Sequence, residues 1–216
     1  MMKKMIYTII LTACTFFVSC KSDSSEGYSV FSVNYIQDYL YPEELVFVYG
    51  NGGSLLAYFQ GESVGNTKTK DKERYAVLSD KYNDKSWNTR MLPFSTAVIE
   101  QPVEYLTVTC DRRFDETHDA GVSLNDIVVL RTSSPYDFVK DGYKITDPSL
   151  PREGTAKGYI VTEGLLSEIG IEDIRLMNPE FRLTFATFPA PGTYTLTVTA
   201  KIGEKQISQS IDMTFE

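Results

Sequence analysis

Apolar and polar positions alternate with a period of two over most of the chain after residue 28. The clearest stretch is EELVFVYGNGGSLLAYFQG, in which residues 45–49 and 54–60 are rich in aromatic and β-branched side chains. The GNGG sequence between them favours a hairpin turn, because Asn and Gly tolerate a positive φ angle. We therefore predict an antiparallel hairpin over residues 45–60.

The same alternation predicts further strands. Along VEYLTVTC, the side chains of Leu106, Val108 and Cys110 share one face, and those of the threonines lie on the other. The carboxy-terminal third carries three half-buried strands with turns at residues 189–192 and 203–204. The predicted strands cover residues 74–79, 95–111, 126–132, 157–162, 171–177, 181–188, 193–201 and 206–215. EGLLSEIG, residues 163–170, is the best helical candidate.

Many short strands with few helical signals predict an all-β, antiparallel β-sandwich of immunoglobulin-like type. In PGTYTLTV, Gly192 ends a turn and Tyr194 opens a strand. We predict structural roles for both, because a tyrosine hydroxyl bonds nearby backbone at the same corner of immunoglobulin-like sandwiches. No repeat or linker divides residues 28–216, which we expect to form a single domain; a small amino-terminal lobe over residues 28–102 is the alternative.

The first residues follow a different pattern. Lys3 and Lys4 precede a mostly apolar run over residues 6–18, and Ser19-Cys20 follows. A membrane-spanning helix needs about 20 apolar residues, whereas a shorter run after a basic start is typical of a secretory signal. A cysteine directly after a small residue is the processing site of bacterial lipoproteins. We predict a cleaved lipoprotein signal peptide at residues 1–19 and lipidation of Cys20, including a palmitate-type acyl chain.

Two alternatives to lipidation of Cys20 stay open. The sequence LTAC ends at Cys14, although the apolar run before it is too short, and an ordinary cleaved signal would leave Cys20 incidental. The polar residues 20–27 are predicted to form a flexible tether. Lys21, Asp23 and Glu26 resemble the lysine or acidic cluster that follows the lipidated cysteine in lipoproteins of the Bacteroides group and marks export to the outer face. The resemblance implies a protein at the outer membrane, held by lipid and facing the cell surface, with the periplasmic face as the alternative.

Net charge limits the classes of partner that the protein can bind, and the cysteine count limits its disulfide bonds. The net charge of −8 becomes −10 when Lys3 and Lys4 leave with the signal. An acidic chain is repelled by phosphate backbones, so we expect no nucleic-acid partner. The same repulsion predicts that the anchor alone holds the protein on the membrane. Loss of Cys14 and lipidation of Cys20 leave Cys110 as the one free thiol, so no internal disulfide is expected.

One cluster, TCDRRFDETHDAGVSLND over residues 109–126, combines groups that carry chemistry. Cys110 and His118 are a candidate nucleophile and base, which would make the protein a hydrolase. The carboxylates of Asp111, Asp115 and Asp119 are weak calcium candidates, because calcium prefers oxygen ligands but their spacing does not match an EF-hand. The favoured interpretation is structural, with Asp side chains capping a long loop and Cys110 inert among apolar neighbours. We predict no catalytic residue, cofactor or metal.

Aromatic residues are plentiful, and most are expected to fill the core. Tyr82 and Trp87 lie in the polar stretch KYNDKSWNTR, so we predict that their rings form a contact patch for a glycan or a protein partner.

The segments VEYLTVTCDRRFDETHDAGVSLNDIV, SPYDFVKDGYK and FRLTFATFPAPGTYTLTVTAKIGEK resemble a family of Bacteroides-group lipoproteins with an immunoglobulin-like domain of unassigned activity. Asp119 stands where proline is common in that family. The resemblance implies a fold and a location in the cell envelope, and no activity. The favoured function is therefore a lipid-anchored, non-enzymatic envelope protein that binds or supports an unknown envelope protein or glycan. A glycan-binding accessory lipoprotein and a hydrolase using Cys110 and His118 are the alternatives.

Overall fold

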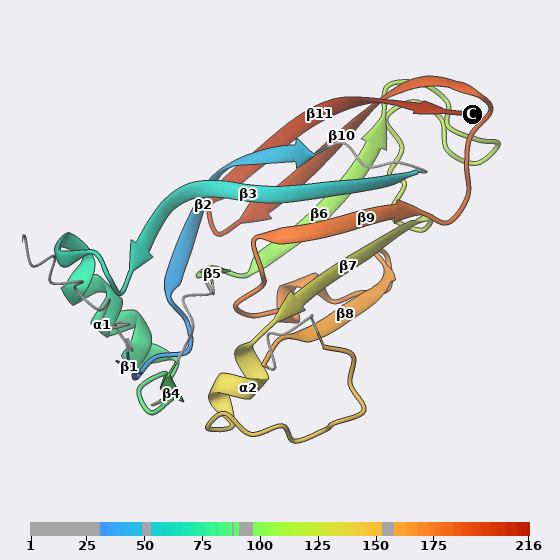
Figure 1. Ribbon diagram of the computed structural model, residues 1–216. Helices are drawn as coiled ribbons and strands as arrows, with labels where there is room; N and C mark the ends of the chain where they lie inside the picture. Colours follow the sequence, from blue (N-terminus) through green and yellow to red (C-terminus); the bar gives the residue numbers. More distant parts are fainter. Residues whose placement is uncertain (1–30, 49–52, 88, 91–96, 153–157) are drawn as a thin grey trace, which may run out of the picture.

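The computed structural model describes residues 31–48, 53–87, 89–90, 97–152 and 158–216. The predicted signal peptide, Cys20 and the tether lie outside these residues. Three sheets are present in the described part, and two of them form a β-sandwich (Figure 1). The prediction of an all-β sandwich is thus confirmed. Among the described residues, no helix has the length and apolar character needed to cross a membrane.

The larger sheet has six strands in the order β5-β2-β3-β9-β7-β8. All neighbours are antiparallel except β2 and β5, which run parallel. The strands are β2 (Asp38–Val48), β3 (Ser54–Gly65), β5 (Ala97–Ile99), β7 (Val128–Ser134), β8 (Ile160–Leu165) and β9 (Glu180–Phe185). Because β3 pairs with β9, the amino-terminal and carboxy-terminal parts of the chain share one sheet.

The smaller sheet has the order β11-β10-β6 and is antiparallel throughout. Its strands are β6 (Val103–Cys110), β10 (Gly192–Ile202) and β11 (Lys205–Phe215). Alternate residues of β10 are buried, as the sequence predicts. The main core lies between the two sheets, where Leu106, Val108 and Cys110 of β6 join buried residues of the larger sheet.

A second cluster of buried residues packs on the other face of the larger sheet at one end. Leu40 and Ile99 belong to the main core, whereas their chain neighbours Tyr39 and Val98 belong to the second cluster, since successive side chains of a strand point to opposite faces. Helix α1 (Lys72–Lys81) contributes Tyr75 to this cluster. The remaining elements are β1 (Phe31–Ser32), β4 (Thr89–Arg90), η1 (Thr69–Asp71), α2 (Tyr136–Lys140) and η2 (Ile171–Asp173).

The strand predicted over residues 95–111 is divided into β5 and β6, which lie in different sheets, and three further predicted elements are wrong. Residues 74–79 belong to α1 and not to a strand. The helical candidate over residues 163–170 instead ends β8 and enters a turn. Residues 171–177 begin with the short helix η2 in place of a strand. In the first two of these three cases tertiary contacts decide the backbone conformation. Residues 72–81 bury Tyr75 and Leu78 as a helix, and β8 pairs along its whole length with β7.

Candidate functional site

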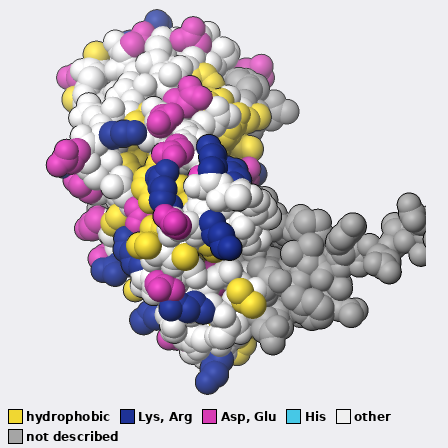
Figure 2. Space-filling model, turned by 90° about the vertical axis from the view of Figure 1, so that its left-hand side faces the viewer, with side chains coloured by type: hydrophobic (Ala, Val, Ile, Leu, Met, Phe, Trp, Pro, Cys, Tyr) yellow, Lys and Arg dark blue, Asp and Glu magenta, His cyan; other side chains and the backbone are white. Residues whose placement is uncertain are grey.

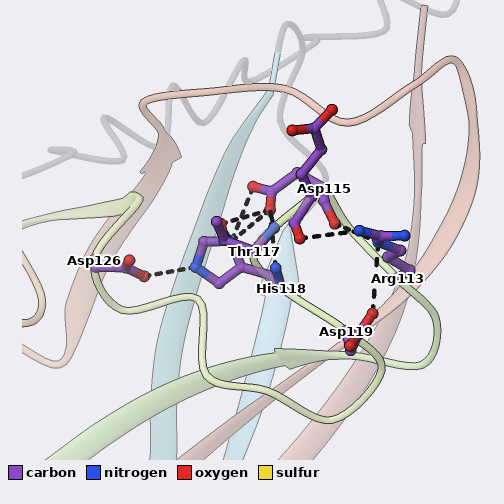
Figure 3. A network of polar contacts seen from close by, with 7 residues as sticks. Arg113, Asp115, Thr117, His118, Asp119 and Asp126 are labelled. Atoms are coloured by element: carbon purple, nitrogen blue, oxygen red, sulfur yellow. Dashed lines mark hydrogen bonds and ion pairs between the residues drawn. The ribbon is translucent and has the colours of Figure 1, made fainter.

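The loop between β6 and β7 is organised around a buried histidine (Figure 3). The His118 side chain is about 5% exposed. Its Nδ1 lies 2.8 Å from both carboxylate oxygens of Asp115, and its Nε2 lies 2.9 Å from Oδ1 of Asp126. A carboxylate accepts hydrogen bonds only, so two carboxylate contacts fit a ring that carries a proton on each nitrogen. We call this Asp115–His118–Asp126 arrangement the histidine clamp.

The Asp115 end of the clamp is built locally. Its Oδ1 accepts hydrogen bonds from the backbone N–H groups of Thr117 at 2.8 Å and His118 at 2.9 Å, and from the Thr117 hydroxyl at 2.9 Å. This is the aspartate capping of a loop that the sequence predicts. Desolvation opposes the charged carboxylate, but these bonds and the His118 ring outweigh it and lower the pKa of Asp115 to about 2.

The pKa of His118 shifts in the opposite direction from that of Asp115. Desolvation disfavours the imidazolium, yet the hydrogen bonds to Asp115 and Asp126 prevail, so the pKa of His118 is raised. The backbone carbonyl of His118 accepts the N–H of Phe114 at 2.8 Å. Phe114 is buried and its ring packs on those of Phe185 and Tyr194. The clamp therefore fixes a loop that closes one end of the main core.

Cys110 and His118 do not form a nucleophile–base pair in this arrangement. The Cys110 thiol is buried in the main core, and its Sγ lies 3.6 Å from Oδ1 of Asp111. Burial raises the pKa of the Cys110 thiol, which disfavours the reactive thiolate. No hydrogen bond joins Cys110 to His118 in the part of the chain that the structure describes, and both ring nitrogens of His118 already face carboxylates.

The three calcium candidates have separate partners. Oδ1 of Asp111 accepts the backbone N–H of Thr195 at 3.0 Å. Oδ1 of Asp119 lies 3.5 Å from Nε of Arg113, and Asp115 belongs to the clamp. Within the described ranges, no three His, Cys, Asp or Glu side chains gather in a way that could hold a metal ion. The geometry therefore gives these aspartates loop-capping and ion-pairing roles.

Tyr194 and Gly192, for which the sequence predicts structural roles, lie at the start of β10. The Tyr194 hydroxyl donates to the carbonyl oxygen of Ala190 at 2.9 Å, which ties the start of β10 to the preceding turn. Gly192 opens the strand with a φ of 155°, a conformation that residues with a side chain rarely adopt.

The predicted contact patch lies at the edge of the second cluster. Tyr82 and Trp87 are half-buried. The Tyr82 ring stacks on Tyr39 with centroids 5.8 Å apart, and Trp87 packs edge-on against Tyr35 at 5.0 Å. Much of each ring is therefore used in packing, which reduces the area that a ligand could contact.

A buried carboxylate in this region is missed by the sequence analysis. Asp84 has no exposed surface, and its two oxygens accept the backbone N–H groups of Tyr35 at 2.7 Å and Ile36 at 2.9 Å. Oδ1 also accepts the hydroxyl of Tyr143 at 2.8 Å. Burial raises the pKa of Asp84, and the three hydrogen bonds oppose that rise.

Asp84 thus joins three segments that are distant in sequence. The motif KYNDKSW gives no signal of this role, because an Asp in a polar stretch is more typical of an exposed turn. The hydroxyl of Tyr39 is buried nearby with no hydrogen-bond partner in the described structure, and the Asp84 charge contributes to its raised pKa, after burial.

The site therefore comprises a histidine clamp on one loop and a buried aspartate in an aromatic cluster, both with structural partners. Comparison with known proteins adds no assignment: no protein-family model, no curated protein and no solved structure matches this chain.

Proposed function

We propose that the protein is a lipid-anchored component of the bacterial outer membrane whose β-sandwich binds or supports another envelope component without catalysing a reaction. The observation that carries the proposal is the amino-terminal sequence, in which a basic start and a short apolar run end at Ser19-Cys20 and a polar tether follows. Acyl chains contribute about 0.8 kcal/mol per buried methylene, so two or more chains give a stable anchor.

The geometry of the loop after β6 supports a non-enzymatic role. Cys110 and His118 most resemble a catalytic pair, but each makes its polar contacts with other residues. The contacts of His118 with two carboxylates support a role in stabilising the loop. A hydrolase would require the thiol to become exposed and the imidazole to leave two carboxylates.

Crosslinking in intact cells followed by capture of the lipidated chain tests the binding role. We expect a reproducible envelope partner that is crosslinked less when Cys20→Ser releases the protein from the membrane. The proposal would be overturned if crosslinking captured no partner and the purified protein turned over a substrate.

Glycan binding is the second candidate, because the half-buried rings of Tyr82 and Trp87 still offer an edge to solvent. It predicts a hit on a glycan array that Trp87→Ala abolishes. An array without hits removes this candidate and leaves the protein-binding role in place.

A further inference from the structure

The charge of this acidic chain is unevenly distributed. Residues 66–85, which include η1 and α1, contain six basic and four acidic residues, and two of the acids, Asp71 and Asp84, are buried. Charges farther apart than about 8 Å are largely screened at physiological salt, so the local surface charge decides what this segment attracts. The net charge of the whole chain does not describe this segment.

Three lysines at the start of α1 are available for a partner. Lys68, Lys70 and Lys72 are exposed, and we call them the lysine tip. Within the described residues none of the three forms an ion pair, and only the Lys68 ammonium has a hydrogen bond, to the carbonyl oxygen of Ser63. The other basic groups of the segment are neutralised, since Arg74 pairs with Glu62, Lys81 with Glu100 and Lys85 with Asp80. Glu73 is an exposed acid next to the tip.

The lysine tip lies at the start of α1, and α1 shares one end of the molecule with β1, the first described strand. Helix α1 and strand β1 occupy the same end in Figure 1, away from the carboxy terminus. On the face that carries α1, Figure 2 shows Lys and Arg side chains among hydrophobic ones over the lower half, and acidic side chains are more frequent in the upper half. Val77 on α1 is 67% exposed, which adds an apolar contact to this end.

The tether length allows this end to reach a membrane. Ten residues, 21–30, separate Cys20 from β1. Phe31, the first residue of β1, is therefore eleven residue steps from Cys20, and at no more than about 3.6 Å per step β1 stays within roughly 40 Å of the lipidated residue. A basic surface held so close to a bilayer meets a high effective concentration of headgroups.

We infer that the lysine tip rests on anionic phospholipid headgroups around the lipid anchor and so orients the sandwich on the membrane. This inference rests on the proposed lipidation of Cys20. It replaces the expectation from net charge that the anchor alone holds the protein. Each Lys near an anionic surface shifts the docking equilibrium by about fivefold, so the tip provides orientation while the acyl chains provide retention.

The test uses the full lipidated chain in vesicles, with an environment-sensitive fluorophore on Thr67→Cys, an exposed residue beside the tip. Quenchers on the lipid headgroups report contact, and flotation reports anchoring. Cys110 is buried, so the label reacts at position 67, and the parent chain gives the background. We expect strong quenching in vesicles that contain phosphatidylglycerol, weak quenching in pure phosphatidylcholine, and a decrease at high salt.

Lys70→Glu/Lys72→Glu should lower the ratio of docked to undocked protein at least tenfold. The control Arg182→Glu/Lys205→Glu changes the net charge equally at exposed positions outside the tip and should leave the ratio unchanged. Equal quenching in both lipids, or equal behaviour of the two double variants, overturns the docking while the anchor stands. A chain that does not float overturns both the anchor and the docking.

Discussion

The imidazole Nε2 of His118 lies 2.9 Å from Oδ1 of Asp126, eight residues further along the chain. This contact joins the middle of the loop that follows β6 to its end before β7, while Asp115 holds the other ring nitrogen. A buried ring with both nitrogens bonded is costly to disturb, because a lost partner leaves a polar atom unsatisfied.

We predict that His118→Gln lowers the free energy of unfolding by about 1–3 kcal/mol, since glutamine cannot reach both carboxylates in the same geometry. Asp126→Asn should lower it less, because the amide oxygen still accepts a bond from the ring. Urea unfolding measures both. Asp119→Asn is the matched control on the same loop, since that side chain is 80% exposed, and it should change little.

The clamp should also give stability a defined pH dependence. The pKa of His118 is raised in the folded state, so its contribution is complete below its ordinary value of 6.5 and is lost as the pH rises through the raised pKa. The pKa of Asp115 is lowered, so its contribution is present above 3.8 and is lost as the pH falls towards about 2. Stability from the clamp is therefore greatest between about pH 4 and 6.5. A His118→Gln profile parallel to the wild type at neutral pH would contradict this.

Asp84 should contribute to the free energy of unfolding with a different pH dependence from that of the clamp. Asp84→Ala leaves two backbone N–H groups and the Tyr143 hydroxyl without their acceptor, so we expect a loss of about 3 kcal/mol or more. Because burial raises the pKa of Asp84, its contribution is complete below its ordinary value of 3.8 and falls as the pH rises through the raised pKa. Relative to Asp84→Asn, the wild type should therefore lose stability as the pH rises above 3.8. Tyr143→Phe, which removes one of the three bonds, should cost about 1 kcal/mol. A constant difference between wild type and Asp84→Asn across this range would show that the carboxylate does not titrate with folding.

Tyr194→Phe removes the corner hydrogen bond and keeps the ring. We predict a loss of about 1 kcal/mol, because the part-buried hydrogen bond to the carbonyl oxygen of Ala190 is removed. Tyr105→Phe provides the comparison, since its hydroxyl bonds Gln206 at the surface, and it should cost less than about 0.5 kcal/mol. Equal effects of the two substitutions in urea unfolding would argue against a special role for the corner.

Cys110 should resist alkylation by iodoacetamide in the folded protein and react once urea unfolds it, because the thiol is buried and its pKa is raised. His118→Gln should leave the protection of the folded state intact except through global unfolding. Rapid alkylation of the native chain that depends on His118 would instead support the hydrolase alternative.

The β-strands could be predicted because half-buried antiparallel strands alternate visibly, as in TYTLTVTAK, where every second residue is buried. Helix α1 could not, because its run KERYAVLSDK carries few apolar residues and buries only Tyr75, Leu78 and Ser79. Its Lys, Glu and Arg residues favour a helix. However, the polar residues before Arg74 suggest a loop, and the alternation of Tyr75 and Val77 with other residues suggests a strand.

The candidate site was predictable where its contacts are local. The Asp115–Thr117–His118 bonds lie within three residues, and loop capping by aspartate is expected from the sequence. The Asp84 contacts span about 50 residues, so only the fold reveals them. The same holds for the lysine tip, since the position of α1 beside β1 is a product of tertiary structure.

Lipidation of Cys20 can be measured directly as the mass of the amino-terminal peptide of the membrane-extracted protein. We predict a peptide that begins at Cys20 and carries a diacylglyceryl group and an amide-linked acyl chain, and that is absent from Cys20→Ser. A mature chain that begins elsewhere, or an unmodified Cys20, would contradict the account.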